Sequence, residues 1–226
     1  MIENPKLPPL VRLVDDDASV LQSEAFVLRL DGWETAVFPT AEDFLAKDDP
    51  ERPGCIVLDV RMPGMNGLTL QQILKTKGRS IPILFLTGHG DIAMAVRALK
   101  RGAADFCTKP IPPEQLQRSV AKLVRWHQAF CRSQAEVESV RSLFEKLTPR
   151  ELEVVRLAAK GLINKEIADV LGSSESTVKL QRTNALKKLE ARRALDLVEL
   201  LQIHDSPQTP QFPISSLDEP DEEAPR

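Results

Sequence analysis

Short apolar runs alternate with helical patterns along the first half of the chain. The apolar runs begin near residues 10, 34, 55, 81 and 104, and Gly, Pro or Asp residues bound them. The segments between them place apolar residues three or four positions apart, as at Leu70, Ile73 and Leu74, which is typical of helices with one buried face. This alternation predicts an α/β fold, a doubly wound parallel sheet of five strands with helices on both faces.

Polar side chains follow four of these predicted strands. Because the carboxyl ends of parallel strands meet at one edge of a sheet, we expect these side chains to converge there. Two interpretations of the acids stay open: they cap the following helices, with Asp17 or Ser19 as the first cap, or a cation offsets their clustered charge. The side chains are Asp15, Asp16 and Asp17 after the first strand, Asp59 after the third, Thr87 after the fourth and Lys109 after the fifth.

The residues around these strand ends carry a family resemblance. Their motifs are Leu13-Val14-Asp15-Asp16-Asp17, Leu58-Asp59-Val60-Arg61-Met62-Pro63-Gly64, Leu86-Thr87-Gly88 and Lys109-Pro110. In this order and spacing they resemble the receiver domain of bacterial two-component response regulators, over residues 10–125. The resemblance implies a flavodoxin-like fold and control by phosphorylation.

The resemblance also implies a role for each of these residues. Asp59 matches the phospho-acceptor, whose carboxylate attacks the phosphohistidine of a sensor histidine kinase. Asp16, Asp59 and the backbone carbonyl of Arg61 match Mg²⁺ ligands, with Asp15 acting through a bound water, and Mg²⁺ prefers such oxygen ligands. A receiver of this kind slowly hydrolyses its own aspartyl phosphate and is not an enzyme on an external substrate. The phosphate-sensing residues are Thr87 and Lys109, and the aromatic switch is Phe106.

The segment after the predicted sheet contains no strong helix breaker between residues 114 and 146. We therefore expect the last helix of the receiver to continue as a linker helix over residues 126–145. A flexible connector stays open as the alternative, because Arg132-Ser133-Gln134 is polar.

Three helix signals follow in the second half of the chain. Thr148, Pro149 and Glu151 predict a helix start with a capping box. A short helix over residues 164–171 then ends at Gly172. The segment Ser173-Ser174-Glu175-Ser176-Thr177 caps a third helix, with Val178, Ala185, Leu186 and Leu189 on its apolar side. Two short helices joined by a tight turn predict a small all-α helix-turn-helix domain, although any helical hairpin shares that geometry.

The third of these helices is basic. Between Val178 and Arg193 lie six lysines and arginines against one acid, Glu190. Within a predicted domain of residues 146–204, the segment Leu147–Leu200 also resembles the LuxR-type DNA-binding domain of the NarL/FixJ class, through Leu-Thr-Pro-Arg-Glu, Gly-Leu-Ile-Asn-Lys-Glu-Ile-Ala and Ser-Thr-Val-Lys. The resemblance places this helix in the major groove of promoter DNA. The implied DNA contacts are Thr177, Lys179 and Arg182, with Lys187 and Lys188 near phosphates. The departure is Glu175-Ser176, where the family often carries Pro-Arg.

Charge and composition add an acidic tail to this picture. Residues 147–204 hold 10 basic and 8 acidic residues, whereas residues 205–226 hold one basic and 6 acidic residues. The Pro, Ser and acid content of 205–226 predicts disorder, without an assigned function. The three cysteines lack metal-ligand spacing, and no apolar run is long enough to cross a membrane, so we expect a cytoplasmic protein that does not bind membranes.

The favoured hypothesis is a phosphorylation-controlled transcription factor that forms a homodimer when phosphorylated. An enzyme is the first alternative, because Asp15-x-Asp17 faintly resembles the nucleophile motif of haloacid-dehalogenase phosphatases; that family expects Thr or Val where Ser19 stands. The second alternative is a regulator that binds only proteins. Salt-dependent affinity for DNA separates the favoured hypothesis from this second alternative, because phosphate contacts make binding weaken as salt rises.

Overall fold

The computed structural model describes residues 7–88 and 92–206, without the side chains of residues 92–94 and 194. The chain divides into two compact units, with the boundary between Cys131 and Arg132. The predicted acidic tail therefore lies outside the described residues from position 207 onward. None of the helices in the described ranges is both long and apolar enough to cross a membrane.

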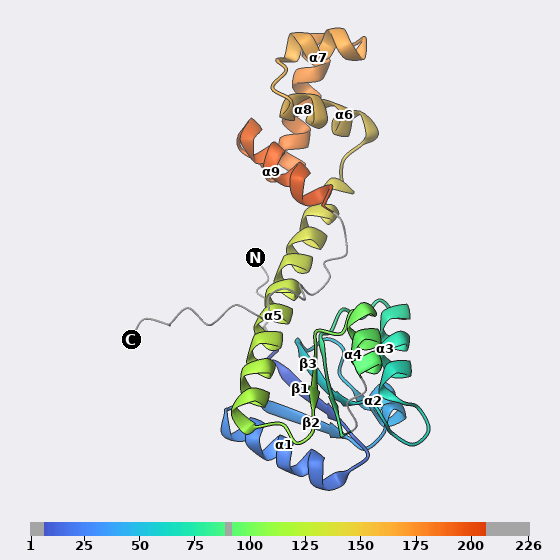
Figure 1. Cartoon of the computed structure of the whole chain (residues 1–226). Helices are drawn as coiled ribbons and strands as arrows, with labels where there is room; N and C mark the ends of the chain where they lie inside the picture. The colour runs from blue at the N-terminus through green and yellow to red at the C-terminus, as the bar shows by residue number, and fades with distance from the viewer. Residues whose placement is uncertain (1–6, 89–91, 207–226) are drawn as a thin grey trace. The chain divides into compact units, whose positions relative to one another are not determined.

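The first unit contains a five-stranded sheet that confirms the predicted α/β fold (Figure 1). The strand order is β2-β1-β3-β4-β5, and every pairing is parallel. One predicted boundary was wrong: the fourth strand begins at Ile83 and not at Ile81, because Pro82 has no N–H to donate to a neighbour. The elements are β1 (Leu10–Val14), α1 (Ala18–Leu30), β2 (Glu34–Phe38), α2 (Ala41–Lys47), β3 (Gly54–Asp59), α3 (Gly67–Thr76), β4 (Ile83–Thr87), α4 (Ile92–Lys100) and β5 (Asp105–Thr108).

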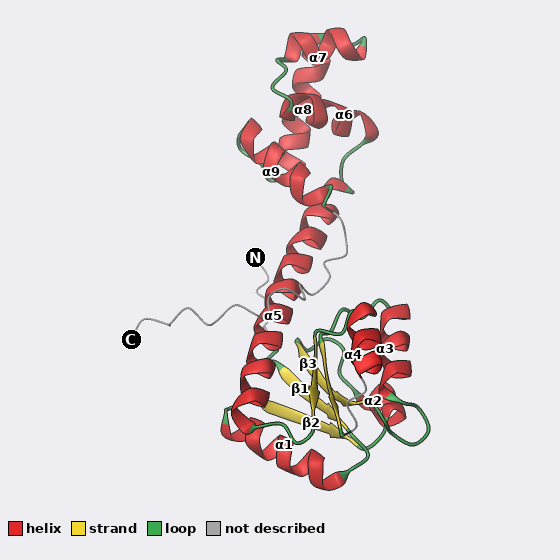
Figure 2. Cartoon of the chain, in the orientation of Figure 1, coloured by secondary structure: helices red, strands yellow, loops and turns green. Residues whose placement is uncertain are grey.

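Helices cover both faces of this sheet (Figure 2). Alternate residues of a strand point to opposite faces. On β3, Cys55 and Val57 pack against the buried faces of α1 and α5, whereas Ile56 and Leu58 pack against α2, α3 and α4. The central strands are buried along their full length, which explains why their sequences read as continuous apolar runs and not as alternating ones.

A buried arginine interrupts the apolar run of β1. The side chain of Arg12 is fully buried, and its Nε donates a hydrogen bond of 2.6 Å to Asp48 after α2. Its other nitrogens donate to backbone carbonyls, including those of Asp49 and Arg52. Arg79 donates to the second oxygen of Asp48 at 2.6 Å. Arg12 is the middle residue of β1, and its partners are distinct from those of the polar residues that follow Val14.

Helix α5 (Pro113–Phe144) contributes side chains to the cores of both units. Leu116, Val120 and Leu123 belong to the core of the sheet, and Val140 and Phe144 belong to the helical core. Residues 126–144 of the predicted linker therefore belong to α5, the helix that follows β5, and Glu145 lies in the turn after it.

His127 joins α5 to the start of β3. Its Nδ1 accepts a hydrogen bond of 2.8 Å from the Gly54 N–H. A side chain at position 54 is excluded, because a Cβ there would lie 1.9 Å from the Leu10 carbonyl oxygen.

The second unit is helical, which confirms the predicted all-α helix-turn-helix class. The capping box is present: the Thr148 hydroxyl accepts from the Glu151 N–H, and the Glu151 carboxylate accepts from the Thr148 N–H. A fourth helix of this unit was not predicted from the sequence; it packs Leu197 into the core. The helices are α6 (Pro149–Ala159), α7 (Asn164–Leu171), α8 (Glu175–Lys188) and α9 (Ala194–His204).

Candidate functional site

The strand register brings the predicted site residues to one edge of the sheet. Val14 pairs with Leu58, so Asp15 and Asp59 are the next residues on neighbouring strands. On the other side of β3, Asp59 pairs with Leu86, which precedes Thr87. Asp15 and Asp59 are 4% and 6% exposed, and Thr87 is 1% exposed. Buried polar side chains at a sheet edge need partners, and the geometry supplies them.

Lys109 holds the two buried carboxylates together. Its ammonium group donates to Asp15 Oδ2 and, at 3.0 Å, to Asp59 Oδ1. The second oxygen of each acid accepts a backbone N–H: Asp15 Oδ1 from Asp17 at 2.9 Å, and Asp59 Oδ2 from Arg61 at 2.6 Å. Lys109 is itself fixed by its N–H, which donates to the Thr87 carbonyl at 2.8 Å. The arrangement places one positive charge between two negative charges.

Burial and charge act against each other in this cluster. Burial raises the pKa of Asp59; the hydrogen bond and charge of Lys109 oppose this rise, and the Asp15 carboxylate adds to it. For Lys109, burial lowers the pKa, but its hydrogen bonds to Asp15 and Asp59 outweigh burial, so the pKa is raised overall. Lys109 therefore stays protonated and acts as the counter-ion of the two acids.

Asp16 stands apart from the buried pair. It is exposed, and it is not joined to Asp15 and Asp59 by Lys109. In the described ranges 7–88 and 92–206, no group of three His, Cys, Asp or Glu side chains has a geometry that could hold a metal ion. The donors nevertheless suit Mg²⁺, which takes oxygen ligands, uses one or two carboxylates and keeps several waters. Three carboxylates beside one ammonium also leave excess negative charge that a divalent cation would offset.

Asp17 has a structural role as the cap of α1. Its Oδ1 accepts from the N–H groups of Ser19 and Val20, at 2.8 and 3.3 Å. The hydrogen bonds of the Ser19 hydroxyl and N–H are the leading causes that lower the pKa of Asp17. A capping carboxylate that is turned toward its own helix is poorly placed for the phosphatase alternative, which requires it as the second catalytic acid.

Phe106 lies on the α4 side of the sheet. It is partly buried, packs against the core that contains Phe85 and Ala98, and its ring centroid is 6.4 Å from that of Phe85. The position of Phe106 on β5 puts it two residues before Thr108, which pairs with Thr87. The predicted switch residue is thus close in register to the predicted phosphate-sensing hydroxyl.

Glu24 is a buried acid of α1 that no motif singled out. Burial raises the pKa of Glu24 to about 7, the charge of Lys109 opposes this rise, and the charges of Asp15 and Asp59 add to it. The signal was available, because Glu24 lies on the same helical face as Leu21, Ala25 and Leu28. An acid within such an apolar face indicates a special environment.

Helix α8 of the second unit exposes the predicted contact residues Thr177 and Lys179. Thr177 is anchored at the helix start, where its N–H donates to the Ser174 hydroxyl at 3.1 Å. The buried side of α8 contains Val178 and Ala185. Leu180 was missed by the sequence analysis; it is 62% exposed beside Lys179, off the buried side, and this displacement from the apolar stripe was the signal.

Two of the predicted DNA contacts are engaged within the helical unit. Arg182 Nη1 donates to the side-chain oxygen of Asn164 at 3.0 Å, which ties α8 to the start of α7. Lys188 Nζ donates to Glu151 at 2.6 Å, which ties α8 to α6. Lys187, by contrast, is exposed. The structure therefore brings Thr177, Lys179 and Lys187 to the surface. Arg182 and Lys188 instead form hydrogen bonds that hold the helices of the unit together.

Comparisons with known proteins cover both units. The family model for the response regulator receiver domain matches residues 11–121, and that for bacterial regulatory proteins of the luxR family matches residues 145–201. Nodulation protein W of Bradyrhizobium diazoefficiens is 41% identical over 191 residues, which cover 84% of each chain. Transcriptional regulatory protein FixJ of the same organism is 35% identical over 84% of this chain and 93% of its own length. The solved structure of the response regulator StyR has a TM-score of 0.79 at 41% identity, and the match covers 86% of this chain and 98% of that chain.

Proposed function

The chain belongs to the two-component response regulators that join a receiver domain to a LuxR-type DNA-binding domain, and we propose that Asp59 is the phosphoryl acceptor that controls its binding to promoter DNA. The carrying observation is the bridge from Lys109 to Asp15 and Asp59 at the carboxyl edge of the sheet. In this proposal residues 10–125 form the receiver, 126–145 the linker helix and 146–204 the DNA-binding domain.

The phosphoryl donor is a phosphohistidine of a sensor histidine kinase. A carboxylate oxygen of Asp59 forms the new P–O bond as the P–N bond breaks, and the imidazole nitrogen keeps the electron pair. The ammonium of Lys109, 3.0 Å from Asp59 Oδ1, is placed to compensate negative charge on the transferred phosphoryl oxygens. The N–H of Arg61 fixes the other carboxylate oxygen, so the nucleophile is oriented before the donor arrives.

Mg²⁺ is the cofactor that this donor set suits, held by Asp16, Asp59 and the Arg61 carbonyl, with Asp15 acting through water. When bound, it neutralises charge on the phosphoryl oxygens and on the acids. Exposure of Asp16 supports this assignment, because an edge carboxylate can reach an ion that keeps several of its waters. The aspartyl phosphate is lost by slow hydrolysis in the receiver itself.

Phosphorylation adds about −1.5 to −2 charges beside Lys109. The Thr87 hydroxyl hydrogen-bonds the new phosphate, and Phe106 responds on the α4 side of the sheet, where it already packs on the core with Phe85. A switch requires an element that has two alternative arrangements, and the added charge must favour one of them. Phe106 is that element in this proposal. The phosphorylated chains then form a homodimer, which binds two half-sites about one DNA turn apart.

In this complex α8 enters the major groove. Thr177 and Lys179 are exposed for base or phosphate contacts, and Lys187 is exposed for phosphate contact. Leu180 adds an apolar surface of the kind that contacts thymine methyl groups. Arg182 and Lys188 hold α8 against α7 and α6, and in this proposal they turn from these partners to phosphates when DNA binds.

The test of the acceptor uses the full chain with Mg²⁺ and a small phosphoryl donor, with phosphate incorporation read by intact mass. We expect Asp59→Asn to abolish incorporation. The matched control is Asp17→Asn, since asparagine also caps helices and should retain incorporation. The opposite pattern, in which Asp15→Asn abolishes transfer and Asp59→Asn spares it, would instead support the phosphatase alternative.

A further inference from the structure

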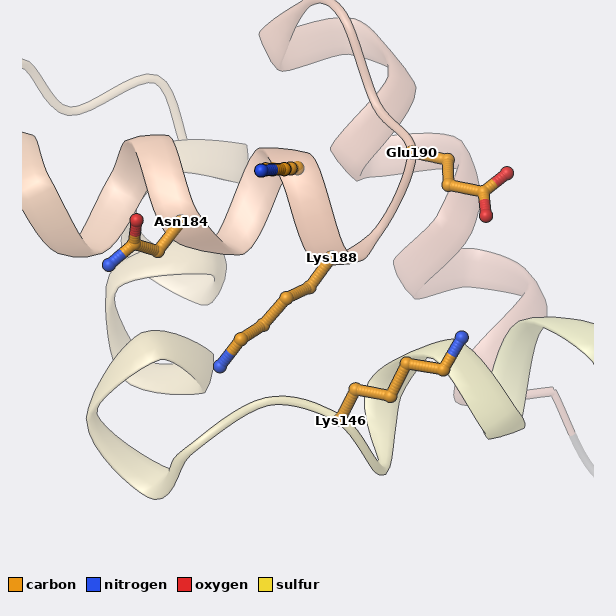
Figure 3. Close-up of a pocket in the computed structure, with 5 residues that line it drawn as sticks. Lys146, Asn184, Lys188 and Glu190 are labelled. Carbon is orange, nitrogen blue, oxygen red and sulfur yellow. The ribbon is translucent and has the colours of Figure 1, made fainter.

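A pocket lined by lysines lies at the end of α8 in the helical unit (Figure 3). Its volume is about 420 Å³, and its lining residues are Lys146, Asn184, Lys187, Lys188 and Glu190. Figure 3 shows Asn184 and Lys188 projecting from α8, while Lys146 rises from the turn after α5. Three ammonium groups against one carboxylate make the pocket suitable for an anionic ligand.

The cations of this pocket have different roles. Lys188 is paired with Glu151 of α6 at 2.6 Å. Lys146 and Lys187 are exposed and approach the pocket from different segments of the chain. A ligand with several separated carboxylates can therefore reach both ammonium groups at once.

The chain itself carries a ligand of this chemistry. Residues 207–226 contain five acids, Asp218, Glu219, Asp221, Glu222 and Glu223, against one basic residue, Arg226. All five acids lie within six consecutive positions. We propose that this acidic run binds the lysine pocket of its own chain and competes there with DNA phosphates, an inference that rests on the proposed DNA binding.

The attachment point of the acidic segment is close to the pocket. The His204 ring packs on the Phe144 ring, with a centroid distance of 4.3 Å, and Arg141 donates to the Ser206 carbonyl at 3.3 Å. Lys146 follows Phe144 by two residues, so their Cα atoms are separated by at most about 8 Å. His204 and Ser206, which precede the acidic segment, are therefore held against the end of α5, next to the turn that carries Lys146.

The length of the segment also allows the contact. Asp218 follows Ser206 by 12 residues. An extended chain spans about 3.3–3.6 Å per residue, so this stretch can bridge about 40 Å. An attached ligand acts at an effective concentration in the millimolar range, so weak carboxylate–lysine contacts suffice to occupy the pocket. When the tail occupies the pocket, it weakens binding to every DNA sequence equally, because the pocket contacts phosphates. The preference for one sequence over another still comes from contacts to the bases.

The experiment measures affinity of the full chain for a non-operator DNA duplex by fluorescence anisotropy at low and at high salt. The test variant converts the five acids to amides: Asp218→Asn, Glu219→Gln, Asp221→Asn, Glu222→Gln and Glu223→Gln. We expect roughly a two- to fivefold gain in affinity at low salt, for a competitor at millimolar effective concentration, and little gain at high salt, where such contacts are screened.

Two backgrounds locate the effect. In Lys146→Gln/Lys187→Gln the gain should disappear, whereas in the charge-matched control Lys160→Gln/Lys165→Gln it should persist. An equal gain in DNA affinity in both backgrounds would overturn the proposed contact between tail and pocket. General repulsion between the acidic tail and DNA would then explain the gain. A third result would be that neutralising the five acids changes nothing while Lys146→Gln/Lys187→Gln weakens DNA binding. That result would overturn the contact with the tail and show that the pocket binds DNA phosphates alone.

A second readout does not depend on DNA. The side-chain amide of Asn184 lines the pocket, so its NMR signals should shift when the five acids are neutralised. Unchanged Asn184 signals would overturn the contact. A chain that binds no DNA but shows this shift would contradict the proposed function and leave the internal contact standing.

Discussion

Removing the charge of Lys109 tests how the cluster of Asp15, Asp59 and Lys109 is held together. In Lys109→Met the carboxylates of Asp15 and Asp59, whose side chains are 5% and 7% exposed, lose their shared counter-ion. Loss of one partner of a buried ion pair costs about 3–5 kcal/mol. Since Lys109 is 19% exposed, we expect the lower part of this range, about 3 kcal/mol at neutral pH. With a urea dependence of about 2 kcal/mol per molar, the midpoint would fall by about 1.5 M.

The pH dependence of this loss has a defined sign. Burial raises the pKa of Asp59, so folding favours its protonated form and ionisation costs stability as pH rises through the folded pKa. Removal of Lys109 takes away the hydrogen bond that opposes this rise. The variant should therefore recover stability, relative to the wild type, as the pH is lowered from neutrality toward the ordinary range of carboxyl groups.

Urea unfolding in EDTA across this pH range, followed by far-UV circular dichroism, checks the prediction. Lys109→Met/Asp59→Asn should be more stable than Lys109→Met at neutral pH, because one of the two carboxylates that repel each other is gone. Lys75→Met, at an exposed lysine of α3, is the matched control and should change stability little. A loss that is independent of pH and is not relieved by the second substitution would refute the electrostatic reasoning.

Three further predictions concern the scaffold. Asp48→Ala leaves the fully buried Arg12 without its carboxylate and should destabilise the receiver by about 3–5 kcal/mol in urea unfolding. Thr148→Ala removes the side-chain cap of α6 and should cost about 1 kcal/mol, measured as a lower melting temperature of the helical unit. Glu190 has φ 56°, a left-handed conformation that costs an L-residue about 1 kcal/mol, so Glu190→Gly should raise that melting temperature. A lower value for this last variant would contradict the strain argument.

Much of the fold could be predicted because its signals are local. The apolar runs of β1, β3 and β4 are buried on both faces, and burial is written directly into the residue types. The capping box of Thr148 and Glu151 is likewise a short-range pattern, and the structure confirms it. The order of strand and helix then fixes which strand ends share an edge, so Asp59 and Lys109 were expected to lie close together.

Only the tertiary structure decided which side chains pair. Lys109 is 94 residues from Asp15 and 50 from Asp59, and its position between them depends on strand register, which no local pattern encodes. The same holds for Arg12, whose charge in an apolar run gave no sign of its partner Asp48, 36 residues away. The sequence by itself therefore determined the kinds of groups at the sheet edge and on α8. Three-dimensional packing decided their partners, because hydrogen bonds between distant segments form only where the backbone brings donor and acceptor within reach.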